Sequence, residues 1–60
     1  MFIGIKETSE RTRRGRSSIY VGINDGTFPK PVQLGARASG FVAVEVDAWI
    51  AARIAERDAA

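Results

Sequence analysis

The sequence predicts a small α+β fold: a winged helix-turn-helix with two short helices, a two-stranded β-hairpin and a C-terminal helix. Three observations lead to this prediction. An apolar stripe with helical spacing runs through residues 42–54. Short alternating segments flank a Gly-containing turn within residues 32–42. Ahead of them, two helix-compatible segments meet at Gly15, as in a helix-turn-helix.

Length and composition limit the architecture and the chemistry. A chain of 60 residues forms one domain, residues 1–60, and buries only about 60% of its unfolded surface. It has no Cys and no His, which excludes disulfides, thiolate or imidazole metal sites, and Cys- or His-dependent catalysis. We therefore expect no enzyme, cofactor or metal. No apolar run approaches the roughly 18 residues of a membrane span, so we expect a cytoplasmic protein.

The charge is unevenly distributed. The segment from Arg11 to Arg37 carries six basic residues and one acid, a net charge of +5, whereas the segment from Phe41 onward carries two basic residues and four acids, or −2. This asymmetry indicates that one half faces a polyanion, although a charged run can also be only a solvated surface. The basic residues of the first segment are Arg11, Arg13, Arg14, Arg16, Lys30 and Arg37.

The N-terminal third predicts a short strand and a weak helix. Residues 1–5, "MFIGI", are apolar and fit a short strand or an anchoring extension. Residues 6–14, "KETSERTRR", fit a helix with Glu near its start and Arg near its end, which suits the helix dipole. Gly15 ends this helix.

Residues 16–26, "RSSIYVGINDG", predict the second helix. Ser17 or Gly15 can cap its start, and Gly26 fits the left-handed position after its end. We expect a narrow apolar face of Ile19, Tyr20 and Ile23, with Ser17, Ser18, Val21 and Gly22 on other faces. The second helix of a helix-turn-helix docks with its N-terminus in the major groove.

Residues 27–42 predict a turn and then a wing. Each Pro in "TFPKP" forces an extended residue before it, and Phe28 is expected to enter the core. "VQL" and "SGFV" alternate around "GARA", which predicts a hairpin with Arg37 at its tip. A hairpin is marginal alone, so it has to lean on the helices.

Residues 44–57 predict the last helix. Its apolar stripe consists of Val42, Val46, Trp49, Ile50 and Ile54, and its alanines favour helix. Glu45 and Asp47 are expected in the first turn, where carboxylates suit the helix dipole. We expect Trp49 to anchor a core with Phe28, Leu34 and Ile50.

The segment "SSIYVGINDGTFPKPVQLGARASGFVAVEVDAWIAARIAER" resembles the AlpA family of prophage regulatory proteins. The resemblance covers nearly the whole chain, about residues 6–57, and its most specific parts are "FPKPVQLGAR" and "EVDAWI". It implies a winged-helix domain related to the MerR and excisionase DNA-binding domains, with a role in prophage transcription or excision. The matching positions are Ile19, Tyr20, Gly26, Phe28, Pro29, Pro31, Val32, Leu34, Gly35, Arg37, Glu45, Val46, Asp47, Trp49 and Ile50.

The chain departs from the family pattern at several positions. Ser18 replaces a Thr, and Gly22 stands where a longer side chain is usual, at a cost of roughly 1 kcal/mol in a helix interior. Gly15 and Val44 stand where the family has capping serines, and a lost cap costs about 1 kcal/mol. Polar residues also replace the usual apolar ones in the first helix and turn: Thr8, Arg11 and Arg14.

We expect DNA contacts from the second helix, the turn before it and the wing. Arg and hydroxyl groups at a helix N-terminus suit phosphate or base-edge contacts. Ser17 and Ser18 could equally be caps, and Tyr20 could be packed with only its hydroxyl exposed. Arg37 has no nearby carboxylate in the sequence, which favours a phosphate or minor-groove contact. The candidate DNA-binding residues are Arg14, Arg16, Ser17, Ser18, Tyr20, Lys30 and Arg37.

Two functions remain open at the level of sequence. The first is a sequence-specific DNA-binding protein, acting as a prophage transcriptional regulator or as an excision directionality factor. The alternative is a protein–protein interaction module that dimerises through its C-terminal helix without binding DNA. The expected partners are double-stranded DNA, further copies in a homo-oligomer or cooperative array, and an integrase or other phage protein.

Overall fold

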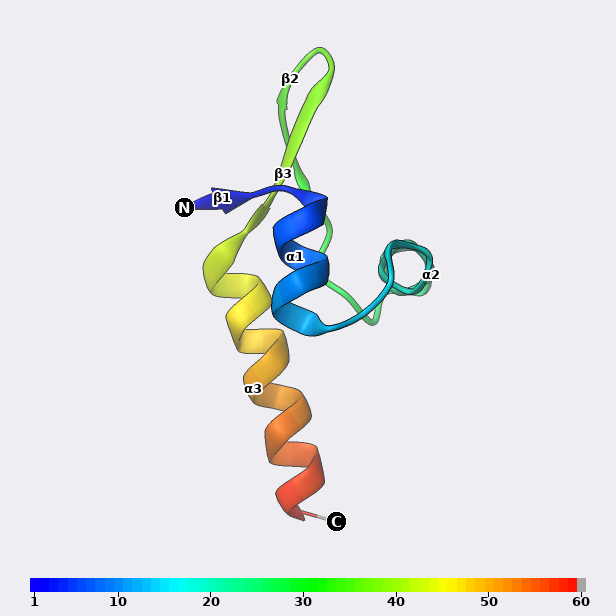
Figure 1. Cartoon of the computed structure of the whole chain (residues 1–60), viewed down its shortest axis with the longest axis vertical. Helices are drawn as coiled ribbons and strands as arrows, with labels where there is room; N and C mark the ends of the chain where they lie inside the picture. The colour runs from blue at the N-terminus through cyan, green and yellow to red at the C-terminus, as the bar shows by residue number, and fades with distance from the viewer. Residues whose placement is uncertain (60) are drawn as a thin grey trace.

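The computed structural model describes residues 1–59 and contains three helices and a three-stranded antiparallel sheet (Figure 1). The predicted α+β class is confirmed. Along the chain the elements are β1 (Phe2–Ile3), α1 (Ile5–Thr12), α2 (Arg16–Asp25), β2 (Val32–Gly35), β3 (Ala38–Val42) and α3 (Ala43–Ala59). In the sheet, the strands have the order β1-β3-β2.

The N-terminal strand extends the hairpin into a three-stranded sheet. β1 pairs antiparallel with β3, with Phe2 opposite Val42 and Ile3 opposite Phe41. The amide of Ala43 donates to the Met1 carbonyl at 2.8 Å, which continues the pairing beyond β3. The apolar start of the chain is therefore a strand, and this third strand supplies the support that an isolated hairpin lacks.

Helix α1 ends earlier than predicted. Its last residue is Thr12, and Arg13 follows in the left-handed conformation with φ 58°, so the chain turns two residues before Gly15. Thr8 is fully buried, and its hydroxyl donates to the Gly4 carbonyl at 2.9 Å. A polar residue thus fits an apolar site because its one polar group is hydrogen-bonded.

Helix α2 has the predicted position and the predicted end. Gly15 is the N-cap and supplies no side chain, so Ser17 lies inside the helix and is not the cap. Gly26 adopts the left-handed conformation with φ 83°, and its amide donates to the Gly22 carbonyl. A glycine takes this conformation without the steric cost that a side chain brings.

Gly22 lies on the buried side of α2, although the sequence placed it outside. A Cβ at this position would lie 2.9 Å from Cβ of Phe28, closer than Cβ atoms approach non-bonded atoms of other residues. The chain after α2 folds back here, and the amides of Thr27 and Phe28 both donate to the Gly22 carbonyl. Gly22 therefore permits close contact between α2 and the core residue Phe28.

The core lies between the sheet and the three helices. Phe28 packs edge-on against Phe41, with ring centroids 5.9 Å apart, and Trp49 packs against Phe28 at 5.0 Å. The prediction that Leu34 packs in this core is wrong. Leu34 is 49% exposed, because Ile3 and Phe41 occupy the inward positions of the sheet. The buried apolar residues are Ile3, Ile19, Phe28, Phe41, Ala43 and Val46, and Ile5, Ile23, Trp49 and Ile50 are partly buried against them.

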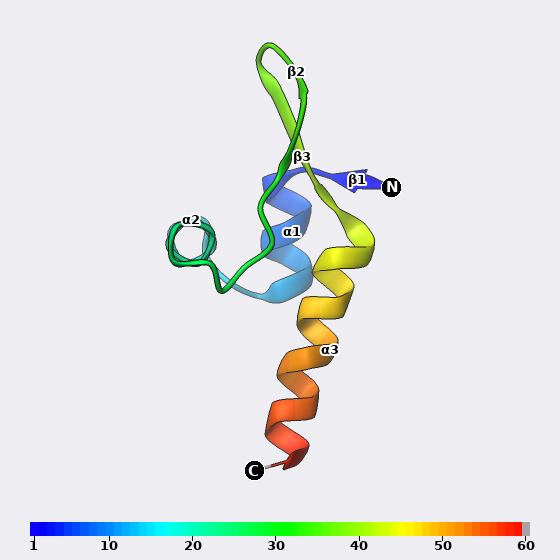
Figure 2. The same ribbon diagram turned by 180° about the vertical axis from the view of Figure 1, so that it is seen from behind.

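The second half of α3 extends away from the rest of the chain (Figure 2). Residues 51–59 are exposed, and Ile54, the last member of the predicted apolar stripe, is 46% exposed. The helix is thus longer than the body it packs against. Within residues 1–59, no helix has the length and apolar character needed to cross a membrane.

Candidate functional site

Helix α2 exposes one continuous stripe of side chains. Ile19 and Gly22 are buried and Ile23 is partly buried, which fixes the side that faces the core. With 3.6 residues per turn, the opposite side carries residues spaced i, i+3, i+4 and i+7. These four residues, which we call the outward stripe, are all exposed: Ser17, Tyr20, Val21 and Asn24. Figure 1 shows α2 end-on, at the edge of the molecule.

Two further predicted residues, Arg16 and Ser18, flank the outward stripe, and Tyr20 belongs to it. Arg16 is exposed in the first turn of α2, and Ser18 is exposed but lies about 100° around the helix from Ser17. Tyr20 is 53% exposed, so the alternative that it packs with only its hydroxyl in water is wrong. The apolar face of α2 therefore consists of Ile19 and Ile23, without the tyrosine.

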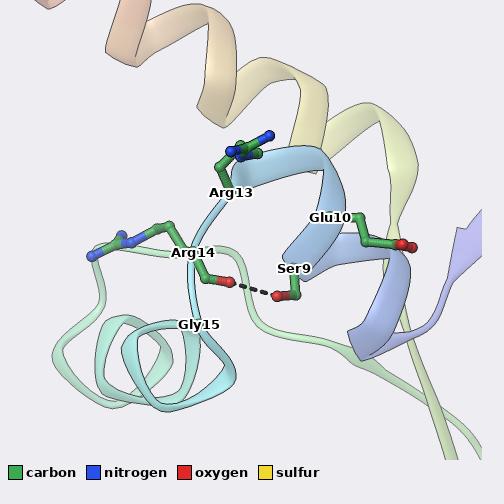
Figure 3. Close-up of a pocket in the computed structure, with 5 residues that line it drawn as sticks. All are labelled: Ser9, Glu10, Arg13, Arg14 and Gly15. Carbon is green, nitrogen blue, oxygen red and sulfur yellow. Dashed lines mark hydrogen bonds between the residues drawn. The ribbon is translucent and has the colours of Figure 1, made fainter.

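The turn between α1 and α2 forms an open pocket with two arginines at its rim (Figure 3). Ser9 donates its hydroxyl to the Arg14 carbonyl at 2.6 Å, which fixes the backbone of the turn. The side chains of Arg13 and Arg14 point in different directions from this turn (Figure 3). The guanidinium of Arg14 lies 5.4 Å from the Trp49 ring centroid, a cation–π contact that orients it from the side of α3.

The hairpin presents Arg37 at its end. Arg37 lies in the two-residue turn between β2 and β3 and is exposed. Lys30 is exposed in the extended segment between Pro29 and Pro31 that leads into β2. The hairpin and α2 project from different parts of the body (Figures 1 and 2), so the structure groups Arg14, Arg16, Ser17, Ser18 and Tyr20 but places Arg37 apart from them.

Ion pairing divides the arginines of the chain into two sets. Arg11, Arg53 and Arg57 each pair with a carboxylate. Within residues 1–59, no ion pair involves the basic residues of the turn, α2 and the hairpin region. These unpaired cations are Arg13, Arg14, Arg16, Lys30 and Arg37; outside this region, the exposed Lys6 of α1 also has no ion pair with a described residue.

Arg11 has a structural role. Its guanidinium lies 2.8 Å from Glu7 one turn earlier in α1 and 3.2 Å from Asp47 in α3. The hydrogen bond from Arg11 to Glu7 raises the arginine's pKa above its ordinary value, and the charges of Glu7 and Asp47 act in the same direction. Asp47 therefore pairs with α1 instead of acting on the dipole of α3 as expected. Arg11 is engaged by these two carboxylates, although the sequence counted it in the basic segment that faces a polyanion.

The end of α2 is held by Asp25 and Trp49. The Asp25 carboxylate accepts hydrogen bonds from the hydroxyl and the amide of Thr27, at 2.6 and 3.0 Å, and these bonds lower the pKa of Asp25. The Trp49 indole N–H donates to the Thr27 carbonyl at 2.8 Å. The turn after α2 is thus tied to α3, which orients α2 against the body.

Three exposed residues of this surface, Arg13, Val21 and Asn24, were not predicted from the sequence as contact residues. Arg13 was counted in the basic segment but not among the contacts, and its left-handed conformation places it at the rim of the pocket. Val21 and Asn24 belong to the outward stripe. Their helical spacing from Ser17 is visible in the sequence. Assigning them to the exposed side of α2 also required knowing that Gly22 lies on the buried side. Among residues 1–59, no three His, Cys, Asp or Glu side chains are grouped to hold a metal ion.

The chain is similar to a family of prophage regulatory proteins and to two proteins of known sequence. Residues 2–54 match the family described as prophage CP4-57 regulatory protein (AlpA). A protein of Enterobacteria phage P4, "Uncharacterized protein ORF88", is 39% identical over 56 residues, covering 93% of this chain and 64% of the phage protein. The "DNA-binding transcriptional activator AlpA" of Escherichia coli K12 is 34% identical over 50 residues, covering 73% of this chain and 71% of that protein.

The chain therefore spans about two thirds of the length of these relatives. No solved structure matches it. The family match covers most of the chain, including α2, the hairpin and the first two thirds of α3. This chain belongs to the AlpA family of prophage regulatory proteins.

Proposed function

We propose that the chain binds double-stranded DNA sequence-specifically and regulates prophage genes, with α2 in the major groove and the hairpin against the backbone or minor groove. The observation that carries the proposal is the division of the arginines. The arginines outside the surface are paired with carboxylates, whereas those of the turn, α2 and the hairpin are not. Cations without a carboxylate partner in their own chain can neutralise phosphates and release counterions.

The residues of this surface divide by the contacts they suit. Arg16 and Ser17 occupy the first turn of α2, where the free backbone N–H groups also favour an anion. Tyr20 follows on the outward stripe, within reach of base edges once the helix N-terminus enters the groove. Ser18, on the flank, suits the phosphate backbone beside the groove.

Arg13, Arg14, Lys30 and Arg37 suit the backbone or the minor groove. They lie on the turn, the loop before β2 and the tip of the hairpin rather than on the outward stripe. Positive side chains at such positions fix orientation and affinity, and carry little information on sequence. Arg37 is the most separate of them, so it is the best residue for testing the hairpin alone.

The E. coli relative is named as a DNA-binding transcriptional activator, and we propose that this chain shares DNA binding and control of transcription. Excision control uses the same protein–DNA chemistry, so the location of the bound site distinguishes the two roles. Footprinting on prophage DNA would protect an integrase promoter in the first case and an attachment site in the second. Such binding needs no catalytic group, cofactor or metal. The protein would act on DNA in the cytoplasm.

The test is a fluorescence anisotropy titration with a duplex selected from a random library and with a scrambled duplex, at several salt concentrations. Arg37→Ala should weaken binding to both duplexes and reduce the slope of log K against log salt by about 0.9. Arg57→Ala is the matched control, because Arg57 is also exposed but pairs with Asp58 at the far end of α3. Equal binding by the parent and Arg37→Ala at every salt concentration would remove the hairpin from the interface; no binding to any duplex would refute the function.

A second candidate function, assembly through α3, is favoured by the exposed second half of that helix. Ile54 is 46% exposed one turn after the partly buried Ile50, so the apolar stripe continues beyond the core. A single small DNA-binding module buries roughly 600–1,000 Å² of protein surface, so self-association or contact with an integrase or other phage protein would add affinity. Sedimentation of the parent and Ile54→Lys tests it: a concentration-dependent dimer that Ile54→Lys abolishes supports assembly, and a monomer at all concentrations excludes it.

A further inference from the structure

Val21 is exposed where the fold does not need an apolar residue. It lies in the middle of the outward stripe and is 61% exposed. A β-branched residue also favours helix less than alanine or most polar residues do. Burial in the core and helix propensity therefore both fail to account for a valine at this position.

The groups around Val21 define what this part of α2 can recognise. Ser17 and Tyr20 contribute hydroxyls, and Asn24 contributes an amide, so the outward stripe has no charged side chain. Bidentate recognition of guanine uses Arg or Lys, and the nearest such residue on α2 is Arg16 at its start. Recognition of cytosine through a carboxylate is also disfavoured, because the carboxylate of Asp25 is engaged by Thr27.

We propose that Val21 contacts the C5 methyl group of a thymine in the major groove, so that the middle of α2 reads an A·T pair. This inference rests on the proposed DNA-binding function and adds a specificity-determining residue to it. Thymine is the one base of the four that presents a methyl group in the major groove, and apolar side chains are its partners. Arg16 in the first turn of α2, and Arg13 and Arg14 in the turn before it, have no ion pair with a described residue, and these cations favour DNA over an apolar protein partner for this surface.

Uracil substitution tests the contact directly, because deoxyuridine lacks only the methyl group and keeps the base-pairing edge. Each thymine of the selected duplex is replaced in turn, and affinities are measured by anisotropy. At one position the parent should lose about fourfold in affinity, the value of burying one methyl group. Val21→Ala should lose the same factor on the thymine duplex and show no further loss with uracil.

Two other variants control for fold and shape. Val44→Ala makes the same change at a valine that is 71% exposed on α3, and it should keep the full response to uracil. Val21→Thr keeps one methyl group and the β-branched shape, so it should retain a preference for thymine over uracil. Circular dichroism of each variant verifies the fold, which a change at so exposed a site leaves intact.

Three results would overturn the inference. If the parent binds the selected duplex specifically but is insensitive to uracil at every position, Val21 does not read a methyl group, although the DNA-binding function stands. If Val21→Ala responds to uracil as the parent does, another residue makes the contact. If Val21→Ala changes the sedimentation of the free protein and not the ratio of thymine to uracil affinity, this surface is a protein interface.

Discussion

Replacing Trp49 should show how far one side chain holds this small domain together. The indole ring packs 5.0 Å from Phe28, its N–H donates to the Thr27 carbonyl at 2.8 Å, and the Arg14 and Arg53 guanidinium groups lie 5.4 and 5.2 Å from its centroid. It therefore joins α3, the turn after α2 and the turn before α2. Trp49→Ala removes all of these contacts, whereas Trp49→Phe removes mainly the hydrogen bond and part of the ring area.

The expected magnitudes follow from burial. A Trp→Ala change in a core costs about 3–5 kcal/mol, and the partly buried position of Trp49 points to about 3 kcal/mol. At about 0.05–0.15 kcal/mol per residue, a chain of 60 residues has a free energy of unfolding of only about 3–9 kcal/mol. Trp49→Ala should thus remove at least about a third of the free energy of unfolding, and all of it at the lower end of this range. Trp49→Phe should cost about 1 kcal/mol, since the exposed Thr27 carbonyl can then bond to water.

Urea unfolding followed by far-ultraviolet circular dichroism measures both variants without relying on tryptophan fluorescence. Ile54→Ala is the control, because Ile54 lies on the same helix, 46% exposed and beyond the core, and should change the free energy of unfolding by less than about 1 kcal/mol. A cooperative transition for Trp49→Ala at the same urea midpoint as the parent would refute the assignment of Trp49 as the residue that joins the helices.

Three further predictions concern α2 and its ends. Gly22→Ala should lower the midpoint of thermal unfolding even though alanine favours helix by about 1 kcal/mol, because its Cβ would lie 2.9 Å from Cβ of Phe28; a higher midpoint would contradict the packing. The lowered pKa of Asp25 means that its stabilising effect is present above the ordinary carboxyl pKa of about 3.9 and is lost as the pH falls through the folded-state value. The difference in stability between the parent and Asp25→Asn should therefore shrink in acid, and unfolding midpoints measured from pH 7 to pH 2 would reveal a constant difference if this were wrong. Arg16→Ala should change the base preference obtained by selection from a random library, whereas Arg37→Ala should leave the selected sequence unchanged; identical selected sequences for the parent and Arg16→Ala would place Arg16 on the backbone.

Local sequence signals predicted the elements well because each signal acts over a few residues. Gly26 marked the end of α2, because a left-handed residue after a helix is best tolerated as glycine. The proline-rich segment marked the exit from α2, and the apolar stripe marked α3. The exposed positions of Arg16, Ser17, Lys30 and Arg37 also agree with the sequence, because such side chains favour water in a chain with so small a core.

The sequence alone was sufficient to predict the three helices and the hairpin in their order, the α+β class, the family and the basic character of the region from the first turn to the hairpin. It left open whether residues 1–5 form a strand. The tertiary structure decided which side chains of that region remain available. It paired Arg11 with Glu7 and Asp47, turned Leu34 outward and Gly22 inward, and left Val21 exposed on α2. These outcomes depend on contacts between residues far apart in the chain. Helical spacing shows which residues share a face, but only the packing of Phe28, Phe41 and Trp49 fixes which face is buried.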